Sequence, residues 1–373
     1  MNILVLSWRD PKHPLAGGAE QVVHEHLKGW IKAGHKVTLF SSSINNLPKC
    51  EILDGVEIVR SGYQYLGVQI AGFFYYLKFR KNFDLVIDQF HGLPFFTPLY
   101  ARKPKLAIIQ ETARKVWFLN PLPKPLNWIV GLIGCLGEPL IFLFYKNTPF
   151  ITGSQSAKKD VTEMRIPEGN ITIVPHGVIL PKFKIKNLKL KIKTIVFLGV
   201  LSKDKGIEDA IKCFKILDRQ DKWNFWVIGR PETVEYGKQI QSLVSKLKFK
   251  NKIKFWGFVS QNKKFELLAK AHVLINPSVY EGWGLVNIEA NAMGTPVIAY
   301  SNAGLVDSVK MGTSGIICQK NTSDNLAEET FNLLQDNQKY ERLKKGALNW
   351  SKKFSWKRSV SQSLLLINKI TNG

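Results

Sequence analysis

The stretch SVYEGWGLVNIEANAMGTPVIA, residues 278–299, carries the most information about the fold. It follows a short apolar run at 273–275 that is typical of a buried strand. After Gly282, Gly284 and Leu285 comes an apparent helix that contains Glu289 and ends near Gly294. A glycine-rich turn that opens a helix directs backbone N–H groups and the positive end of the helix dipole at one place. We therefore predict a diphosphate-binding loop here, at the carboxyl end of a strand.

Strand-like runs and helical patterns alternate along the chain on both sides of this stretch. The first forty residues read as a strand at 2–7, a helix that ends near Gly34 and a second strand at 36–40. Further strand-like runs lie at 56–59, 84–87, 106–109, 150–152, 171–174, 195–198, 225–228, 253–255, 273–275 and 297–299. This alternation predicts an α/β chain whose parallel sheets are covered by helices on both faces.

The length of the chain predicts two lobes. Its 373 residues exceed what one hydrophobic core organises, since domains cluster at about 100 to 200 residues. The run KFKIKNLKLKIK at 182–193 alternates lysine with apolar residues, which favours a linker or an edge strand over an interaction motif. We place the boundary there, between a domain at 1–180 and a domain at 181–354.

Cysteine usage and the N-terminus bear on the compartment. The four cysteines lie far apart without a Cys-x-x-Cys pair, so neither a zinc site nor a disulfide framework is predicted. The chain starts directly with a strand-like run and shows no basic region followed by an apolar signal segment. We expect a cytoplasmic protein. The apolar run at 126–145 is about long enough to span a bilayer, but Glu138 and Pro139 argue against a span.

The charge balance predicts an anionic partner. With 53 Lys plus Arg against 29 Asp plus Glu, the net charge is +24, which favours polyanions or an anionic membrane surface. The lysines are spread over both halves and no nucleic-acid-binding signature is present, so no nucleic acid is predicted as a partner. A lysine-rich proteome is the alternative explanation of the charge.

Glu281 and Glu289, separated by seven residues inside the opening stretch, resemble the motif of the retaining glycosyltransferases called family 4, or group 1. That family has the GT-B fold of two Rossmann-like doubly wound lobes around an interlobe cleft. The resemblance implies a nucleotide-diphosphate-sugar donor whose ribose hydroxyls bind Glu289 and whose sugar contacts Glu281. It also implies that the backbone at Gly284, Leu285 and Val286 meets the phosphates.

Two further segments match the family in order and spacing. Gly17 and Gly18 follow the first strand and resemble the family's N-terminal Gly-Gly loop, which faces the phosphates and the acceptor. His176, in VPHGV, matches the His-Gly-Val signature that closes the first lobe, where hinge packing and donor contact are both open roles. The terminal segment at 355–373 resembles the family's C-terminal helix, which crosses back to the first lobe.

The phosphate-binding cations depart in part from the family pattern. In GVLSKDKG at 199–206, Lys205 matches the family's lysine, but Val200 stands where arginine is usual. Lys203 is a candidate replacement, although a lysine lacks the bidentate hydrogen bonds of a guanidinium. The alternative is that Lys203 is a solvated lysine in a turn, without a role in binding.

The first lobe departs from the family at its catalytic face. Where a histidine often follows a strand, this sequence has Gln110 and Glu111, which we take as candidate catalytic residues beside Glu281 and Lys205. In retaining transfer the leaving phosphate can take the acceptor proton, so a protein base is not required. His91, in QFHGLP, is a further candidate with either a substrate or a structural role.

Two aromatic and basic stretches predict contact with a membrane. One is FFYYLKFRK at 73–81; the other has Trp117, Phe118, Trp128 and Ile129 near Lys115 and Lys124. Core packing explains their apolar part equally well. Peripheral contact with an anionic membrane at its inner face would suit a lipid-linked acceptor.

The sequence thus predicts a retaining hexosyltransferase that moves a sugar from a nucleotide-sugar to a glycan or lipid-linked acceptor in envelope polysaccharide or glycolipid synthesis. No Asp-x-Asp triplet or His/Cys cluster is present, so we expect no metal cofactor. Three alternatives stay open: a catalytically degenerate nucleotide-sugar-binding subunit, a GT-B epimerase or phosphorylase, and a polyanion-binding protein.

Overall fold

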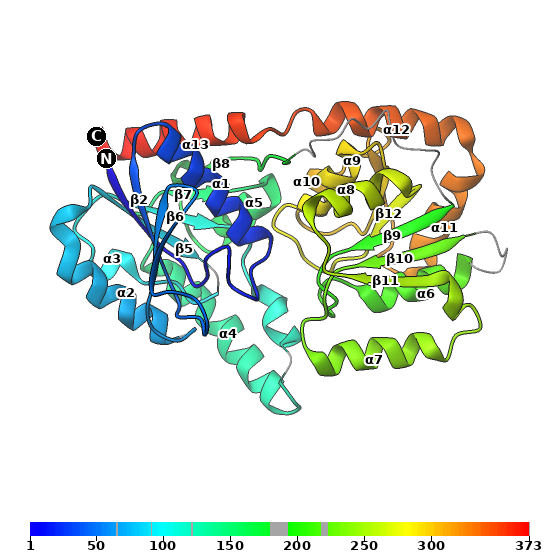
Figure 1. Ribbon diagram of the computed structural model, residues 1–373, viewed down its shortest axis with the longest axis horizontal. Helices are drawn as coiled ribbons and strands as arrows, with labels where there is room; N and C mark the ends of the chain where they lie inside the picture. Colours follow the sequence, from blue (N-terminus) through cyan, green and yellow to red (C-terminus); the bar gives the residue numbers. More distant parts are fainter. Residues whose placement is uncertain (65, 91, 121, 180–192, 218–222, 373) are drawn as a thin grey trace. The chain divides into compact units, whose positions relative to one another are not determined.

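The computed structural model describes residues 1–372 except 65, 91, 121, 180–192 and 218–222. The chain divides into two compact units, each described by itself: unit 1 comprises Met1–Gly177 with Ser355–Gly373, and unit 2 comprises Val178–Phe354. Both are layered α/β structures (Figure 1). Most of the lysine-rich run at 182–193, predicted to be a linker or an edge strand, lies outside the described residues.

Unit 1 is built on an eight-stranded sheet with the order β3-β4-β2-β1-β5-β6-β7-β8. Its neighbours pair in parallel except β3 and β4, which form an antiparallel hairpin at one edge. The strands are β1 Asn2–Leu6, β2 Lys36–Ser41, β3 Cys50–Leu53, β4 Val56–Arg60, β5 Leu85–Phe90, β6 Lys105–Ile109, β7 Phe150–Thr152 and β8 Ile171–Ile173. The sequence prediction missed β3.

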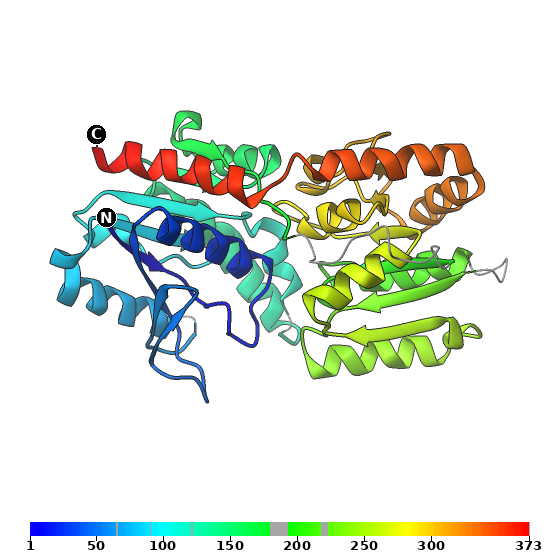
Figure 2. The ribbon, with the colours of Figure 1, turned by 45° about the horizontal axis from the view of Figure 1, so that its top comes forward.

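The helices of unit 1 cover both faces of this sheet. They are α1 Gly18–Lys32, α2 Leu66–Phe79, α3 Thr97–Tyr100, α4 Leu126–Leu143, α5 Gln155–Glu163 and α13 Trp356–Asn372, with short 3₁₀ turns η1 Arg80–Asn82, η2 Arg114–Leu119 and η3 Glu168–Asn170. The terminal helix α13 lies along α1 (Figure 2). Trp30 Nε1 donates a 2.9 Å hydrogen bond to Ser363 Oγ, and the neighbouring ring of His26 lies 3.0 Å from the same oxygen.

Unit 2 contains a six-stranded, all-parallel sheet with the order β11-β10-β9-β12-β13-β14. Its strands are β9 Thr194–Leu198, β10 Asn224–Ile228, β11 Ile253–Gly257, β12 Val273–Asn276, β13 Val297–Ala299 and β14 Gly315–Ile317. The helices are α6 Ile207–Leu217, α7 Val234–Ser245, α8 Gln261–Lys270, α9 Leu285–Ala292, α10 Leu305–Ser308, α11 Ser323–Gln335 and α12 Asn337–Ser351, with a 3₁₀ turn η6 Lys250–Lys252.

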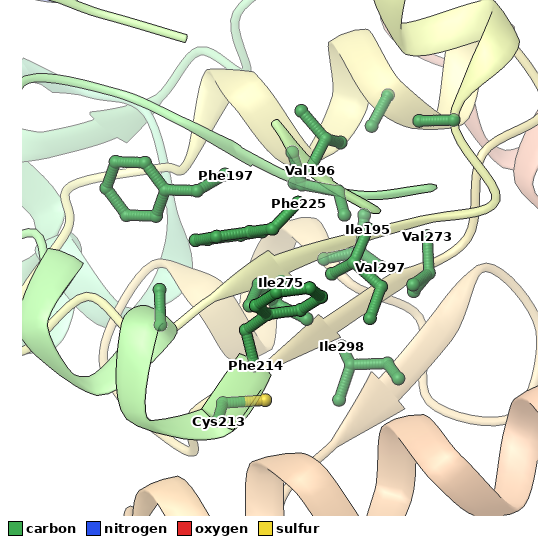
Figure 3. Close-up of a cluster of buried hydrophobic side chains, with 14 of the residues drawn as sticks. Ile195, Val196, Phe197, Cys213, Phe214, Phe225, Val273, Ile275, Val297 and Ile298 are labelled. Atoms are coloured by element: carbon green, nitrogen blue, oxygen red, sulfur yellow. The ribbon is translucent and has the colours of Figure 1, made fainter. Parts of the chain in front are cut away.

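The core of unit 2 explains why its strands read as continuous apolar runs. The inner strands β9, β12 and β13 are buried on both faces, as parallel strands between two helix layers must be, whereas the edge strand β11 is partly exposed. Figure 3 shows the centre of this core, where the rings of Phe214 and Phe225 stack with their centroids 5.2 Å apart. Cys213 lies in the same cluster, and burial raises the pKa of its thiol. In both sheets the loops at the carboxyl ends of the strands are the place for a ligand.

Candidate functional site

Lys205 and Glu281 form an ion pair at the carboxyl end of the unit 2 sheet. Lys205 lies in the turn between β9 and α6, and Glu281 lies in the loop between β12 and α9. Because β9 and β12 are neighbours, the two loops meet, and Lys205 Nζ donates to Glu281 Oε1 at 2.9 Å. Each side chain keeps about a fifth of its surface exposed, 24% and 19% respectively. The pair therefore remains accessible to a ligand.

The loop that carries Glu281 is held by buried amides. Asn276 Oδ1 accepts from the backbone N–H of Ser278 at 3.2 Å, while Asn276 Nδ2 donates to Asn287 Oδ1 at 2.9 Å. Asn287 in turn donates to Ser308 Oγ at 2.9 Å. All four side chains are buried. The loop is thus fixed to α9 and α10 by hydrogen bonds.

Gly304 packs closely against the backbone of Glu281. Its φ of +73° lies in the left-handed region, and a Cβ built there would lie 2.1 Å from the carbonyl oxygen of Glu281. Gly312 has a similar φ of +69°, but nothing lies within 4 Å of its Cβ position. The two glycines thus have a similar positive φ and differ in whether a side chain would displace the loop.

We expect Gly304→Ala to weaken donor binding by at least about tenfold, because a 2.1 Å approach forces the Glu281 backbone outward. Gly312→Ala is the matched control. Both variants should lose about 1 to 2 kcal/mol of folding free energy from a non-glycine left-handed residue. Isothermal titration with the donor and urea denaturation separate the two effects. Equal donor affinity in the two variants would contradict this account of the loop.

The N-terminus of α9 opens beside this loop. Gly284, the residue before the helix, has the left-handed φ of +77°, and Leu285 and Val286 are the first helical residues. The N–H groups of a helix's first turn lack intrahelical acceptors and carry the positive end of the dipole. Together with the ammonium group of Lys205, this end of unit 2 is electropositive.

Glu289 is paired with Lys264, a residue that the sequence reasoning missed. Glu289 lies one turn into α9 and is only 7% exposed. Lys264, on the neighbouring helix α8, places its Nζ 2.5 Å from Glu289 Oε1. The partners are 25 residues apart, so no local pattern connects them. The pair fixes the direction in which the Glu289 carboxylate points.

Val200 occupies the place expected for an arginine, and Arg230 lies next to it. The segment around Val200 runs beside the loop after β10, with Leu201 N bonded to Arg230 O at 2.9 Å and Glu232 N bonded to Leu201 O at 3.1 Å. The Arg230 guanidinium lies over the exposed ring of Phe258, 5.8 Å from its centroid. Lys203 is an exposed turn residue whose ammonium makes no ion pair within the described residues.

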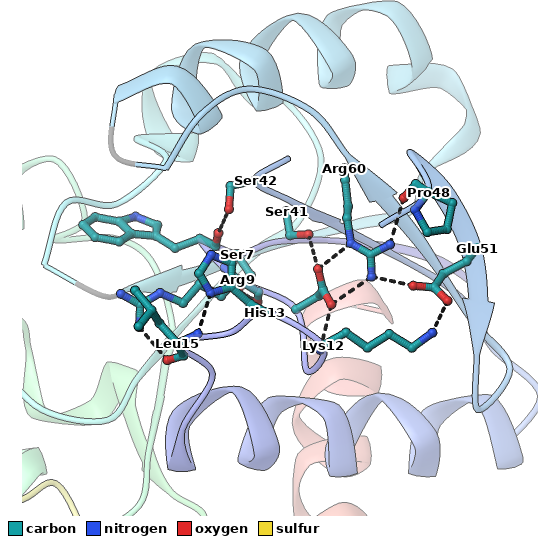
Figure 4. A network of polar contacts seen from close by, with 12 residues as sticks. Ser7, Arg9, Lys12, His13, Leu15, Ser41, Ser42, Pro48, Glu51 and Arg60 are labelled. Atoms are coloured by element: carbon teal, nitrogen blue, oxygen red, sulfur yellow. Dashed lines mark hydrogen bonds and ion pairs between the residues drawn. The ribbon is translucent and has the colours of Figure 1, made fainter. Parts of the chain in front are cut away.

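In unit 1, the Gly17–Gly18 turn opens α1 at the carboxyl end of β1. The backbone N–H of Gly17 donates to Glu20 Oε2 at 2.7 Å, which sets the first turn of the helix. The loop that leads to this turn is anchored by Asp10, whose carboxylate accepts two hydrogen bonds from Arg60, at 2.7 and 2.9 Å (Figure 4). Arg60 also pairs with Glu51, which binds Lys12.

Gln110 and Glu111 follow β6 as predicted, and Gln110 contacts His176. His176 Nε2 lies 2.6 Å from Gln110 Oε1, and the imidazole stacks on Trp356 with the centroids 6.4 Å apart. Burial lowers the pKa of His176 to about 3, so the ring is neutral and its Nε2–H donates to Gln110. His176 is therefore packed inside unit 1. His91 lies outside the described residues, as does the side chain of Lys115.

The structure brings most of the predicted donor residues together on one unit. Glu281, Lys205, Glu289 and the start of α9 gather around the carboxyl ends of β9 and β12. The remaining candidates, Gly17, Gly18, Gln110 and Glu111, belong to unit 1. In the described part of the chain, no three His, Cys, Asp or Glu side chains are grouped as metal ligands.

Comparison with known proteins gives this arrangement a family. The model of "Glycosyl transferases group 1" matches residues 180–350, and that of "Glycosyltransferase Family 4" matches residues 16–180. An uncharacterised glycosyltransferase of Methanocaldococcus jannaschii is 31% identical over 52% of this chain and 52% of its own length. The capsular polysaccharide biosynthesis glycosyltransferase CapM of Staphylococcus aureus is 29% identical over 51% of this chain and 53% of its own.

The curated relatives are thus matched over about half of their length. Among solved structures, Anabaena HepE in complex with UDP-glucose superposes with a TM-score of 0.73 and 17% identity, over 99% of this chain and 100% of that one. The two family models together run from residue 16 to residue 350, and the superposition shows a shared fold. The chain therefore belongs to the group 1 glycosyltransferases and has their GT-B fold.

Proposed function

We propose that this chain transfers a sugar from a nucleoside diphosphate-sugar to a hydroxyl acceptor with retention of anomeric configuration. One observation carries the proposal. Unit 2 gathers the Lys205–Glu281 pair, the first turn of α9 and the Lys264–Glu289 pair around the ends of neighbouring strands. A cation and helix amides beside two carboxylates match the parts of a nucleotide-sugar: phosphates, sugar hydroxyls and ribose hydroxyls.

We assign the donor roles as the family resemblance implies. Glu289, held by Lys264, accepts hydrogen bonds from the ribose, while Glu281 accepts from hydroxyls of the donor sugar. The N–H groups of Leu285 and Val286 and the ammonium of Lys205 meet the diphosphate. Since Anabaena HepE binds UDP-glucose, a UDP-hexose is the first donor to test.

The reaction needs stabilisation of the leaving nucleoside diphosphate. Negative charge grows on that group as the glycosidic bond breaks, and in this proposal Lys205 and the α9 dipole stabilise that charge without a metal ion. We assign Arg230 to supplement this charge, because its backbone borders the Val200 segment. In retaining transfer the acceptor hydroxyl attacks the face that the diphosphate leaves, and its proton passes to the departing phosphate oxygen.

Unit 1 supplies the acceptor side in this proposal. Gln110 is held by neutral His176, and its amide nitrogen is buried without a hydrogen-bond partner among the described residues, so this donor is left for a further acceptor. Glu111 follows β6 and the Gly17–Gly18 turn follows β1, two strands of the same sheet that are separated by β5. A glycan or lipid-linked hydroxyl in polysaccharide or glycolipid synthesis is the proposed acceptor, a role consistent with CapM among the relatives.

A donor-binding subunit without activity is the second candidate, favoured by Val200 at the arginine position and Gln110 at the histidine position. Both candidates predict that one nucleotide-sugar from a panel raises the melting temperature appreciably. Only an active transferase should also hydrolyse that donor slowly or transfer its sugar. Binding without turnover would favour the subunit, and stabilisation by none of the panel would contradict both.

Glu289→Gln tests the assignment of the donor site. The substitution removes a charged acceptor, so we expect the Kd of the donor to rise about 10- to 100-fold, which corresponds to about 1.5 to 3 kcal/mol. Glu266→Gln on α8 is the matched control, since Glu266 pairs only with Lys263 and Lys270 at the surface among the described residues. The control should bind the donor normally. Equal affinities in the two variants would place the donor elsewhere.

A further inference from the structure

Helix α4 has two apolar faces, and one of them packs against the rest of unit 1. Gly131 and Gly134 lie so close to η2 that a Cβ would come within 2.4 Å of the Phe118 ring and 2.3 Å of the Trp117 ring. Phe142 is fully buried on the same face. The glycines let the helix lie flush on the two aromatic rings.

Glu138 fixes α4 to the body of unit 1. It is only 4% exposed although it lies in the most apolar helix of the chain. Its carboxylate accepts from the backbone N–H groups of Ala113 and Arg114 at 2.7 and 2.8 Å, and from Trp117 Nε1 at 3.2 Å. These donors belong to η2 and the residue before it, so the buried charge is satisfied only while α4 stays on η2.

The opposite face of α4 is apolar and uncovered. Its large side chains are between 45% and 66% exposed, and together they form the apolar face: Trp128, Ile129, Leu132, Ile133, Leu136, Leu140 and Leu143. The helix is long and apolar enough to cross a membrane by length and composition. Only 17% of it is buried within the protein, so most of it is exposed. A water-exposed patch of this kind marks an interaction site, since soluble proteins rarely expose one.

Helix α2 continues this surface through ring contacts. Phe73 on α2 meets Tyr100 of α3 with the centroids 5.0 Å apart, and Phe96, just before α3, meets Phe144, just after α4, at 6.3 Å. The outer stripe of α2 is itself exposed, with Leu66, Ile70, Phe74 and Leu77 at helical spacing. The uncovered apolar side chains of α2 and α4 therefore belong to connected elements.

The charges around these helices are almost all positive. Residues 61–83 contain no acidic residue, and residues 92–149 contain only Glu111 and the buried Glu138. Exposed basic side chains flank the apolar ones: Lys78, Arg80, Lys81, Arg102, Lys124 and Lys146. Apolar side chains bordered by cations complement an anionic lipid surface, whose headgroups take the cations while the acyl region takes the apolar groups.

We propose that the apolar face of α4, with the stripe on α2, docks unit 1 on a bilayer that contains anionic phospholipid. Helix α4 lies in the plane of the interface and does not span the membrane, because Glu138, Gly131 and Gly134 tie it to η2 along its length. This surface brings unit 1, the proposed acceptor side, to lipid-linked hydroxyls. The docking itself does not depend on the proposed transfer reaction.

Sedimentation with vesicles tests the proposal on the full chain. The wild type should sediment with vesicles of phosphatidylcholine plus phosphatidylglycerol, and should do so less at high salt. Replacing three residues of the apolar face, Ile133→Ser/Leu136→Ser/Leu140→Ser, should lower the bound fraction at least about tenfold. The matched control, Ile52→Ser/Val234→Ser/Leu365→Ser, removes equally exposed apolar side chains from elsewhere and should bind as the wild type does.

Further measurements test two alternatives to peripheral docking: a second copy of the chain on this face, and a membrane span. Light scattering without vesicles should show the same mass for the wild type and the triple variant; a wild-type dimer that the variant loses would mean that a second copy covers the face. Alkaline carbonate should extract the bound protein, and resistance would indicate a span. Unchanged donor-induced stabilisation in the triple variant shows that it is folded. Equal vesicle binding by the wild type and the triple variant would overturn the proposal.

Discussion

Lys205→Met is expected to lower kcat by about 10²- to 10³-fold, which corresponds to about 2.7 to 4 kcal/mol of lost transition-state stabilisation. The Nζ of Lys205 lies 2.9 Å from Oε1 of Glu281, and Glu281 lies on the loop that leads into α9. The charge of Lys205 acts most strongly when the diphosphate departs, because negative charge is then largest. The ground-state affinity for the donor should change less than kcat does.

Two matched lysines make this expectation specific. Lys212 on α6 forms a surface pair with Asp209 at 3.1 Å, and Lys212→Met should keep the wild-type rate. Lys203 lies two residues before Lys205 in the same turn but is exposed, and Lys203→Met should cost at most about tenfold. Steady-state kinetics with the donor found by thermal shift measure all three variants. A Lys205→Met enzyme within tenfold of the wild type would remove Lys205 from the reaction.

The sequence predicted the features that are local in the chain. Runs such as 195–198 and 273–275 became buried parallel strands because an apolar run between two helix layers is written in consecutive residues. The β3–β4 hairpin was missed although its signal was present: Asp54 and Gly55 both have positive φ, and an Asp-Gly pair between strands is typical of such a turn. Its strands are short and half-exposed, so their pattern is weak.

Contacts between distant segments could not be predicted in this way. The sequence identified Glu289 by its motif, but Lys264 meets it from a separate helix, where lysines are common and no spacing marks this one. The same holds for Glu138, which the sequence treated as an argument against a membrane span. Its amide partners on η2 became visible only once the chain was folded. Which face of α4 is covered likewise depends on tertiary packing.

Arg60→Met is expected to destabilise unit 1 by about 3 to 5 kcal/mol at neutral pH. Its side chain is 1% exposed and that of Asp10 is fully buried, so the substitution leaves an unpaired carboxylate in the interior. Lys12→Met is the matched control in the same network: its side chain is 41% exposed, so the loss should stay below about 1 kcal/mol. Hydrogen exchange of peptides from β2, β4 and α1 reports this change within unit 1.

The pH dependence of the Arg60→Met effect identifies its cause. In the wild type, burial alone would raise the pKa of Asp10, but hydrogen bonds from Arg60 and Lys12 N hold it below its usual value. Without Arg60 burial prevails, so the pKa of Asp10 in the folded variant rises above its unfolded value. A folded state that binds the extra proton gains stability as pH falls. The deficit relative to the wild type should therefore shrink from pH 7 to pH 4. A deficit independent of pH would indicate lost packing of the arginine side chain, whereas the carboxylate explanation requires that Arg60→Met/Asp10→Asn recover part of the loss.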